Sequence, residues 1–186
     1  RPQVRWALAV TAVMLAAYAA VVAIASRPLV ELNAFFPSLD AIVFVSDLVT
    51  AVLLYAQFSI SRSRALLALA TGYLFTALIV IPHALTFAGA FSPTGLLGAN
   101  IQTGSWLFIF WHIGFSAGLL AYAVQEEEWF AAHVSGWRPL PAVGWSVAGV
   151  IGLVCALTWL ATAGATLLPP IVLDQRRISP IVVYPI

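Results

Sequence analysis

Charged residues are scarce in this chain, and their scarcity decides its class. Only 8% of the 186 residues are charged, whereas 62% are hydrophobic. Soluble globular domains carry about 25% charged residues, so the composition predicts an integral membrane protein. The net charge of +1 provides no basic surface for a phosphate backbone, which excludes nucleic acid as a partner.

The chain also lacks the features that identify an enzyme or a transporter. Its single cysteine, Cys155, lies in an apolar run and cannot form an internal disulfide. There is no nucleotide-binding motif, no nucleophile–base pair and no metal-hydrolase spacing, so we do not expect an enzyme. A permease is disfavoured as well, because paired broken helices and inverted repeats are missing.

Long apolar runs are what the chain has in abundance. Five of them approach or exceed the roughly 20 residues that a helix needs to cross a bilayer. They are Trp6–Ile24, Ala41–Ile60, Ala65–Ala88, Thr103–Val124 and Val143–Leu167. We therefore predict an all-α, polytopic transmembrane bundle with about five spans, forming a single domain over residues 1–186 with membrane lipid around it.

Arginine is distributed unequally between the two sides of such a bundle. Five arginines fall on the side of the N-terminus and three on the opposite side. They are Arg1, Arg5, Arg62, Arg64 and Arg138 against Arg27, Arg176 and Arg177. The positive-inside rule then predicts a cytoplasmic N-terminus and an outer C-terminal tail. The apolar run Ile178–Ile186 in that tail is a candidate for the start of a sixth helix.

Three ionisable residues interrupt the predicted spans. Asp47, His83 and His112 lie in the second, third and fourth spans. With a rise of 1.5 Å per residue they lie about 9, 8 and 13 Å from the outer ends of their helices. Ionisable groups in lipid cost several kcal/mol unless they are partnered, so they are functional candidates by default. We expect these three side chains to share the outer third of the bundle.

Polar stripes and aromatic residues extend this prediction to a pocket. Helical spacing places Gln57 on the face of Asp47, and Tyr73 on the face of His83. Trp106, Phe108 and Trp111 provide an aromatic lid on the fourth span. The candidate ligand- or cofactor-binding residues are therefore Asp47, His83, His112, Trp106, Trp111, Gln57 and Tyr73.

Two glycines on the fourth span indicate a close helix contact. Gly114 and Gly118 form a GxxxG pattern, which allows another helix to approach closely. The contact could be internal or a dimer seam. In the third span, Pro82 has no backbone N–H to donate to the helix, which predicts a kink beside His83.

The chemistry of the three ionisable residues leaves several alternatives open. Two imidazoles on neighbouring helices can ligate haem b or a transition metal, so His83 and His112 are the candidate metal ligands. A nearby carboxylate such as Asp47 could orient one imidazole. The same residues could instead form a pH-responsive switch or bind a small ligand. A purely structural role is the plain alternative, since interhelical hydrogen bonds contribute about 0.6 kcal/mol on average.

Two segments of the sequence resemble a known family. They are DLVTAVLLYAQFSISRSRALLALATGYLFTALIVIPHALTFAGAF and GLLGANIQTGSWLFIFWHIGFSAGLLAYA. The signatures are PHALTF at 82–87, Trp111-His112 with Gly114-Phe115, and the pattern that runs from Asp47 to Phe58. They resemble the fourth type of membrane-associated sensor domain, the integral-membrane input domain of GGDEF diguanylate cyclases and some histidine kinases. The resemblance runs from about Phe36 to Asp174.

The resemblance implies a role and a location. It implies a sensory input module in the bacterial inner membrane that binds a small ligand or cofactor and transmits to a cytoplasmic output domain. The family domain has more spans than this chain, so a truncated domain is expected. A homodimer or a membrane complex is the expected assembly. Ala88 and Ser116 stand where the family tends to have proline.

Two other functions remain as alternatives to the sensor. A haem-binding electron-transfer subunit would use His83 and His112 as axial ligands. A structural or assembly subunit of a larger membrane complex would direct its polar stripes at protein partners.

Overall fold

The computed structural model describes residues 2–24, 34–127, 139–174 and 177–178. The chain divides into two units, Arg1–Leu32 and Asn33–Ile186. The first unit contains helix α1 (Pro2–Ile24). Its side chains from residue 4 to residue 22 are all exposed and almost all apolar, as a lipid-facing helix requires.

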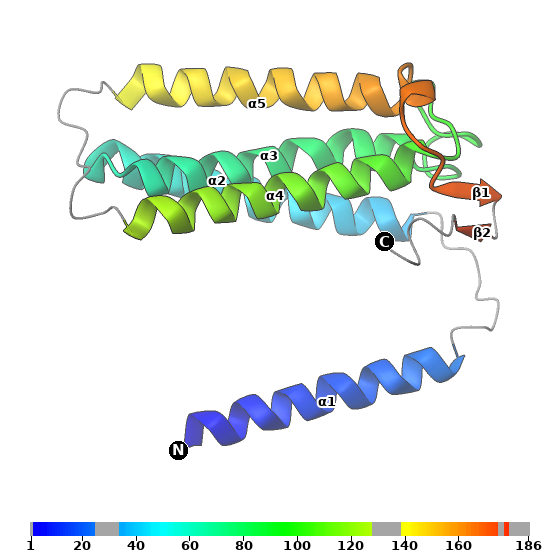
Figure 1. Ribbon diagram of the computed structural model, residues 1–186, viewed down its shortest axis with the longest axis horizontal. Coiled ribbons are helices and arrows are strands. Elements are labelled where there is room, and N and C mark those ends of the chain that lie inside the picture. The colour runs from blue at the N-terminus through cyan, green and yellow to red at the C-terminus, as the bar shows by residue number, and fades with distance from the viewer. Residues whose placement is uncertain (1, 25–33, 128–138, 175–176, 179–186) are drawn as a thin grey trace. The chain divides into compact units, whose positions relative to one another are not determined.

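The second unit contains four long helices that run alongside one another (Figure 1). They are α2 (Phe35–Ser61), α3 (Arg64–Thr86), α4 (Thr103–Glu127) and α5 (Pro139–Ala161). Together with α1 they make five helices that are long and apolar enough to cross a membrane. The predicted all-α bundle with five spans is confirmed.

Three helices begin four or more residues earlier than the sequence predicted, and each has a proline in its first turn. The predicted first span started at Trp6, but α1 begins at Pro2. The predicted second span started at Ala41, but α2 begins at Phe35 and includes Pro37. The predicted fifth span started at Val143, but α5 begins at Pro139. Proline is tolerated in the first turn of a helix, because the N–H that it lacks has no partner there in any case.

Helix α3 is the central element of the second unit. It packs against α2, α4 and α5, and it contributes twelve buried residues whereas α2 and α5 contribute three each. A tight turn joins it to α2, in which Arg62 adopts a left-handed conformation with φ of 57°. The Ser63 hydroxyl then accepts from the Leu66 N–H at 3.4 Å and caps α3. A helix enclosed on three sides is well placed to carry a buried site.

The predicted close contact at the GxxxG pattern is confirmed, and it lies inside the unit. A Cβ atom built on Gly118 would lie 2.9 Å from the Cα of Gly72 on α3. One built on Gly114 would lie 2.1 Å from the ring of Phe75. Helices α3 and α4 therefore meet backbone to backbone, and α3 contacts both glycines of the GxxxG pattern.

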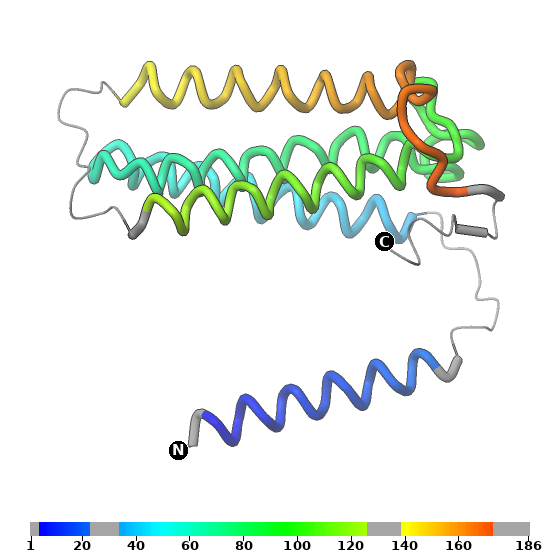
Figure 2. The backbone as a smooth tube through the Cα atoms, viewed as in Figure 1, coloured from blue at the N-terminus to red at the C-terminus, as the bar shows by residue number. Residues whose placement is uncertain are grey.

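The connections after α3 and after α5 gather at one end of the helices, which we call the capped end (Figure 2). The cap comprises residues 87–102, the short 3₁₀ helix η1 (Ala165–Leu167), β1 (Val172–Asp174) and β2 (Arg177–Ile178). The strands pair antiparallel, with Val172 opposite Ile178. Residue 178, predicted to begin a sixth helix, therefore lies in a strand, and residues 179–186 lie outside the described part of the chain.

One glutamine attaches this cap to the start of α4. The side-chain oxygen of Gln102 accepts from the N–H groups of Ile171 and Val172 at 2.8 and 2.9 Å, and its amide nitrogen donates to the carbonyl of Val172. Next to it, the Thr103 hydroxyl donates to the Ala161 carbonyl at 2.9 Å. The side chain of Gln102 thus pairs with β1 as a neighbouring strand would.

Replacing Gln102 with alanine is expected to detach β1 from α4. Loss of these hydrogen bonds should lower the free energy of unfolding by about 1.5 kcal/mol. Amide exchange at Ile171 and Val172 should accelerate, which hydrogen-exchange mass spectrometry would measure. Gln125→Ala is the matched control, because Gln125 lies near the far end of α4 and its amide nitrogen donates to the Ala121 carbonyl of its own helix at 2.9 Å. Equal exchange in both variants would contradict the attachment.

Candidate functional site

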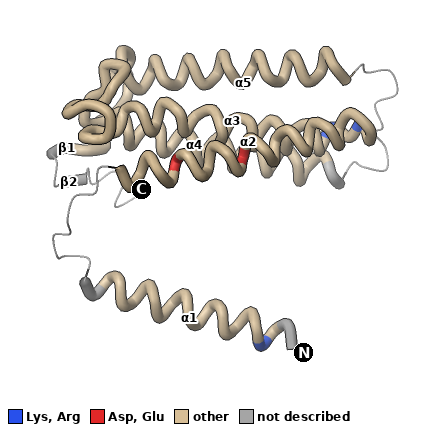
Figure 3. Tube along the Cα trace, turned by 180° about the vertical axis from the view of Figure 1, so that it is seen from behind, with Lys and Arg blue, Asp and Glu red and all other residues tan. Residues whose placement is uncertain are grey.

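A buried contact between an aspartate and a histidine lies near the capped end. The Nδ1 of His83 on α3 lies 2.8 Å from an Oδ2 of Asp40 on α2. Asp40 is 5% exposed and His83 is 8% exposed. Figure 3 shows acidic positions within the apolar length of α2, and basic positions beside the connection from α2 to α3. The pair joins two helices inside an apolar bundle, where such a contact is expensive to break.

The sequence predicted a different carboxylate in this site. Asp47 was expected beside the histidines, but it is half-buried and lies beside Thr76, whose hydroxyl donates to the Gly72 carbonyl at 2.8 Å. Asp47 lies seven residues after Asp40, about two turns or 10 Å further along α2. The predicted second span began at Ala41, after Pro37, which left Asp40 just outside it. Read instead as a first-turn residue, Pro37 would have placed Asp40 and His83 at matching distances from the ends of their helices.

The partner of His83 determines which ring nitrogen remains available. With Asp40 as a carboxylate, which only accepts hydrogen bonds, Nδ1 of His83 is the donor. Within the described part of the chain, Nε2 of His83 has no hydrogen-bond partner. A carboxylate that fixes the ring in this way is also how proteins orient histidines that bind a metal or a ligand through the other nitrogen.

Rings from α4 surround this histidine. The ring centroid of His83 lies 6.4 Å from Phe108 and 6.1 Å from Trp111. On α4 itself, His112 lies 4.0 Å from Phe108 and 4.9 Å from Trp111. We call these four residues the aromatic–imidazole cluster. The two histidines thus share the same two aromatic neighbours, although His83 is buried and His112 is exposed.

The remaining predicted residues are spread over the bundle. Trp106 lies at the cap, where its Nε1 donates to the Pro169 carbonyl at 3.3 Å, and its ring lies 5.5 Å from Phe110. Tyr73 is half-buried and packs edge-on against Phe115 at 5.4 Å. Gln57 is exposed, near the end of α2 opposite the cap. These three residues do not gather around His83. Of the two tryptophans predicted in the lid, Trp111 lies beside His83, whereas Trp106 contacts the cap.

A second polar contact joins three helices further from the cap. The Ser146 hydroxyl of α5 lies 2.6 Å from the hydroxyl of Tyr55 on α2 and 2.6 Å from that of Thr71 on α3. Thr71 donates its only proton to the Leu67 carbonyl at 2.7 Å. Ser146 must therefore donate to Thr71, and Tyr55 must donate to Ser146. Nothing in the sequence predicted this series of hydrogen bonds, because hydroxyl residues inside apolar spans show no periodic pattern.

Metal binding can be tested against the side chains that the structure describes. Among them, no three His, Cys, Asp or Glu side chains converge as a group that could hold a metal ion. Ligation of a metal ion or of haem b by His83 and His112 stays a prediction. Each of the two rings offers its Nε2, since each Nδ1 already has a partner.

The sequence of this chain matches the model of one known protein family. A family model described as "Membrane-associated sensor, integral membrane domain" (MASE4) matches residues 30–183. The match includes α2 to α5 and the whole cap. Comparisons with curated proteins and with solved structures give no match.

Proposed function

Because the chain belongs to the MASE4 family of membrane-associated sensor integral membrane domains, we propose that it is the input module of a bacterial signalling protein. A small ligand or cofactor binds near the capped end, and the change in helix packing reaches a cytoplasmic diguanylate cyclase or histidine kinase domain. The module lies in the inner membrane with a cytoplasmic N-terminus, as the arginine distribution favours. We expect it to act as a homodimer or within a membrane complex.

The observation that carries this proposal is the buried Asp40–His83 hydrogen bond. It is 2.8 Å long and links α2 to α3. It also lies beside the aromatic–imidazole cluster, in which His112 and Phe108 are exposed. A ligand that binds this cluster therefore contacts the ring whose position fixes two helices relative to each other.

The mechanism is a shift between two arrangements of α2 and α3. In one arrangement His83 donates to Asp40, and in the other that bond is lost or exchanged for the ligand. A ligand changes the populations only by its different affinity for the two arrangements. A hydrogen bond to a charged group contributes roughly 1.5–3 kcal/mol, which is enough to change the ratio of two states about tenfold or more.

His83→Gln is expected to change signalling output while leaving membrane insertion intact. Glutamine retains a polar side chain but lacks the ring that contacts both Asp40 and the cluster. In cells producing the intact signalling protein, we expect the basal cyclic di-GMP level, or the kinase phosphorylation, to change about tenfold, in line with the strength of the lost bond. The response to the stimulus should be lost.

Ser59→Ala is the matched control for this experiment. It removes a hydroxyl that donates to the Tyr55 carbonyl of its own helix at 2.9 Å, at the end of α2 opposite the cap. Immunoblotting of the membrane fraction should show equal amounts of both variants. Unchanged basal output together with an unchanged response in His83→Gln would refute the proposal.

A further inference from the structure

An ionisable group lies on the outward face of α4. His112 is exposed, and so is Ser116 one turn further along. Both lie well inside the stretch Thr103–Gln125 that is apolar enough to span the membrane. A polar side chain that faces hydrocarbon without a partner costs free energy, so this face calls for a polar partner within the membrane.

The hydrogen bond of His112 defines what that partner must offer. Nδ1 of His112 lies 2.8 Å from the carbonyl oxygen of Phe108. A carbonyl has no proton to give, so Nδ1 carries the hydrogen and donates it. The neutral ring then presents Nε2 as a hydrogen-bond acceptor. The Phe108 ring lies 4.0 Å away and packs on the imidazole, which leaves the edge of the ring that carries Nε2 for a donor.

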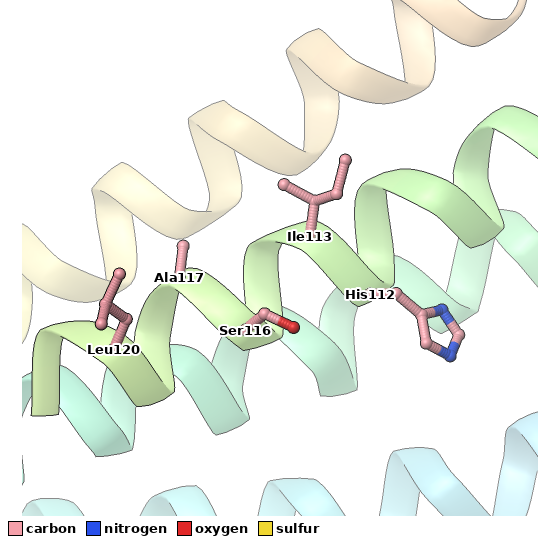
Figure 4. A pocket seen from close by; sticks show the side chains of 5 residues that line it. All are labelled: His112, Ile113, Ser116, Ala117 and Leu120. Atoms are coloured by element: carbon pink, nitrogen blue, oxygen red, sulfur yellow. The ribbon is translucent and has the colours of Figure 1, made fainter. Parts of the chain in front are cut away.

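A hollow of about 430 Å³ follows this histidine along α4 (Figure 4). Its lining residues are His112, Ile113, Ser116, Ala117 and Leu120. All five residues lie on α4 and the hollow is open over most of its extent, so it is a shallow groove on the outward face of the helix. From His112 to Leu120 the hollow is about 12 Å long. Its polar groups are gathered at the His112 end and its far end is apolar, so it suits an elongated molecule with a polar head and an apolar body.

We propose that this hollow binds a lipid-soluble alcohol of the phenol class, with its hydroxyl donating to Nε2 of His112. The apolar body lies along Ala117 and Leu120. A lipid acyl chain has no donor and would leave Nε2 unpartnered. The binding site stands on these contacts alone; its role as the sensory input rests on the proposed function.

A second protein helix fits this face less well than a small molecule does. Close packing of membrane helices relies on small residues, but the glycines of α4 at 114 and 118 already contact α3. The outward face carries Ile113 and Leu120, which are 63% and 66% exposed, beside the smaller Ser116 and Ala117. A helix that packed on this face would also have to supply a hydrogen-bond donor to Nε2 of His112.

The test uses imidazole-¹⁵N-labelled protein in nanodiscs of phosphatidylcholine and phosphatidylglycerol. The chain has three histidines, so the ring nitrogens can be assigned by substitution. The probe is 2-naphthol, and 2-methoxynaphthalene is its counterpart without a donor. We expect 2-naphthol to shift the Nε2 resonance of His112 saturably, and the methyl ether to leave it unchanged.

Variants locate the site. His112→Leu should weaken 2-naphthol binding roughly tenfold, as expected for the loss of one hydrogen bond. Gly149→Ala on α5, where an added Cβ meets nothing within 4 Å, should bind normally. Equal shifts with both probes, or no shift with either, would overturn the proposal. If the Nε2 resonance of His112 shifts with protein concentration in the absence of any probe, the face binds a second copy of the chain. That result would also overturn the proposal.

The outcome also separates this inference from the proposed function. Saturable binding of 2-naphthol at His112 without any change in cellular output would support the site and count against the sensory role assigned to it. A changed output in His83→Gln without 2-naphthol binding would support the sensor and reject this ligand class.

Discussion

Replacing Asp40 with alanine is expected to destabilise the bundle much more than the same change at Asp47. Asp40 is the buried partner of His83, whereas Asp47 is half-buried beside Thr76. Removing one partner of a buried ion pair costs about 3–5 kcal/mol in soluble proteins, but single hydrogen bonds between membrane helices contribute at most about 1.7 kcal/mol. We expect a loss of about 2 kcal/mol for Asp40→Ala, between these ranges, and less than half of that for Asp47→Ala.

A double-mutant cycle isolates the contact itself. His83→Ala should destabilise by a similar amount or more, because it leaves the carboxylate without its donor. The double variant should lose less than the sum of the two single losses, with a coupling energy of about 1–2 kcal/mol. The free energies of unfolding would be measured by titrating mixed micelles with sodium dodecyl sulfate. Additive losses would contradict the contact, and a larger loss for Asp47→Ala would restore the carboxylate that the sequence predicted.

Substitution of Gly118 by leucine is expected to be the most damaging single change in the second unit. Even a Cβ at this position would lie 2.9 Å from the Cα of Gly72, and a backbone atom cannot move aside as the end of a side chain can. Overpacking a core typically costs about 1–3 kcal/mol, and a whole isobutyl group between two helices should exceed that range. We expect α3 and α4 to separate and the protein to aggregate on extraction.

Two further glycine variants calibrate this result. Gly118→Ala should cost about 1–3 kcal/mol, measured by thermal unfolding in detergent. Gly152→Leu on α5 serves as the control, since an added Cβ there has no neighbour within 4 Å. Size-exclusion chromatography of the extracted variants would give the comparison. A monodisperse, stable Gly118→Leu protein would show that α3 and α4 do not pack as closely as the structure indicates.

The number of helices could be predicted from the sequence, because length and hydropathy alone define a span. The GxxxG contact was also predictable, since Gly114 and Gly118 lie on one face at helical spacing. Whether that contact is internal was not, because nothing in the pattern names Gly72 as the partner. The predicted starts at Ala41 and Val143 were wrong, because proline opens a helix as readily as it ends one and α2 and α5 begin at Phe35 and Pro139.

The candidate site could be predicted only in part. His83 and His112 were identified from the rarity of ionisable residues in lipid, and the structure places both beside Phe108 and Trp111. The partner of His83 could not be identified, because a shift of two turns in the start of α2 exchanges Asp47 for Asp40. Gln102 gave no signal either, since its partners are backbone groups some 70 residues away.

The hydroxyl chain from Tyr55 through Ser146 to Thr71 has a direction, and its end determines what it can do. The last hydroxyl, that of Thr71, donates its hydrogen bond to the carbonyl oxygen of Leu67. A backbone carbonyl is neither an acid nor a base near neutral pH. A proton entering at Tyr55 would therefore have nowhere to leave, so the chain cannot serve as a proton wire. Its effect is mechanical: α2, α3 and α5 are tied together away from the cap. Helix α4 has no hydroxyl in this tie, and it is held against α3 by the close approach of Gly118 to Gly72 instead.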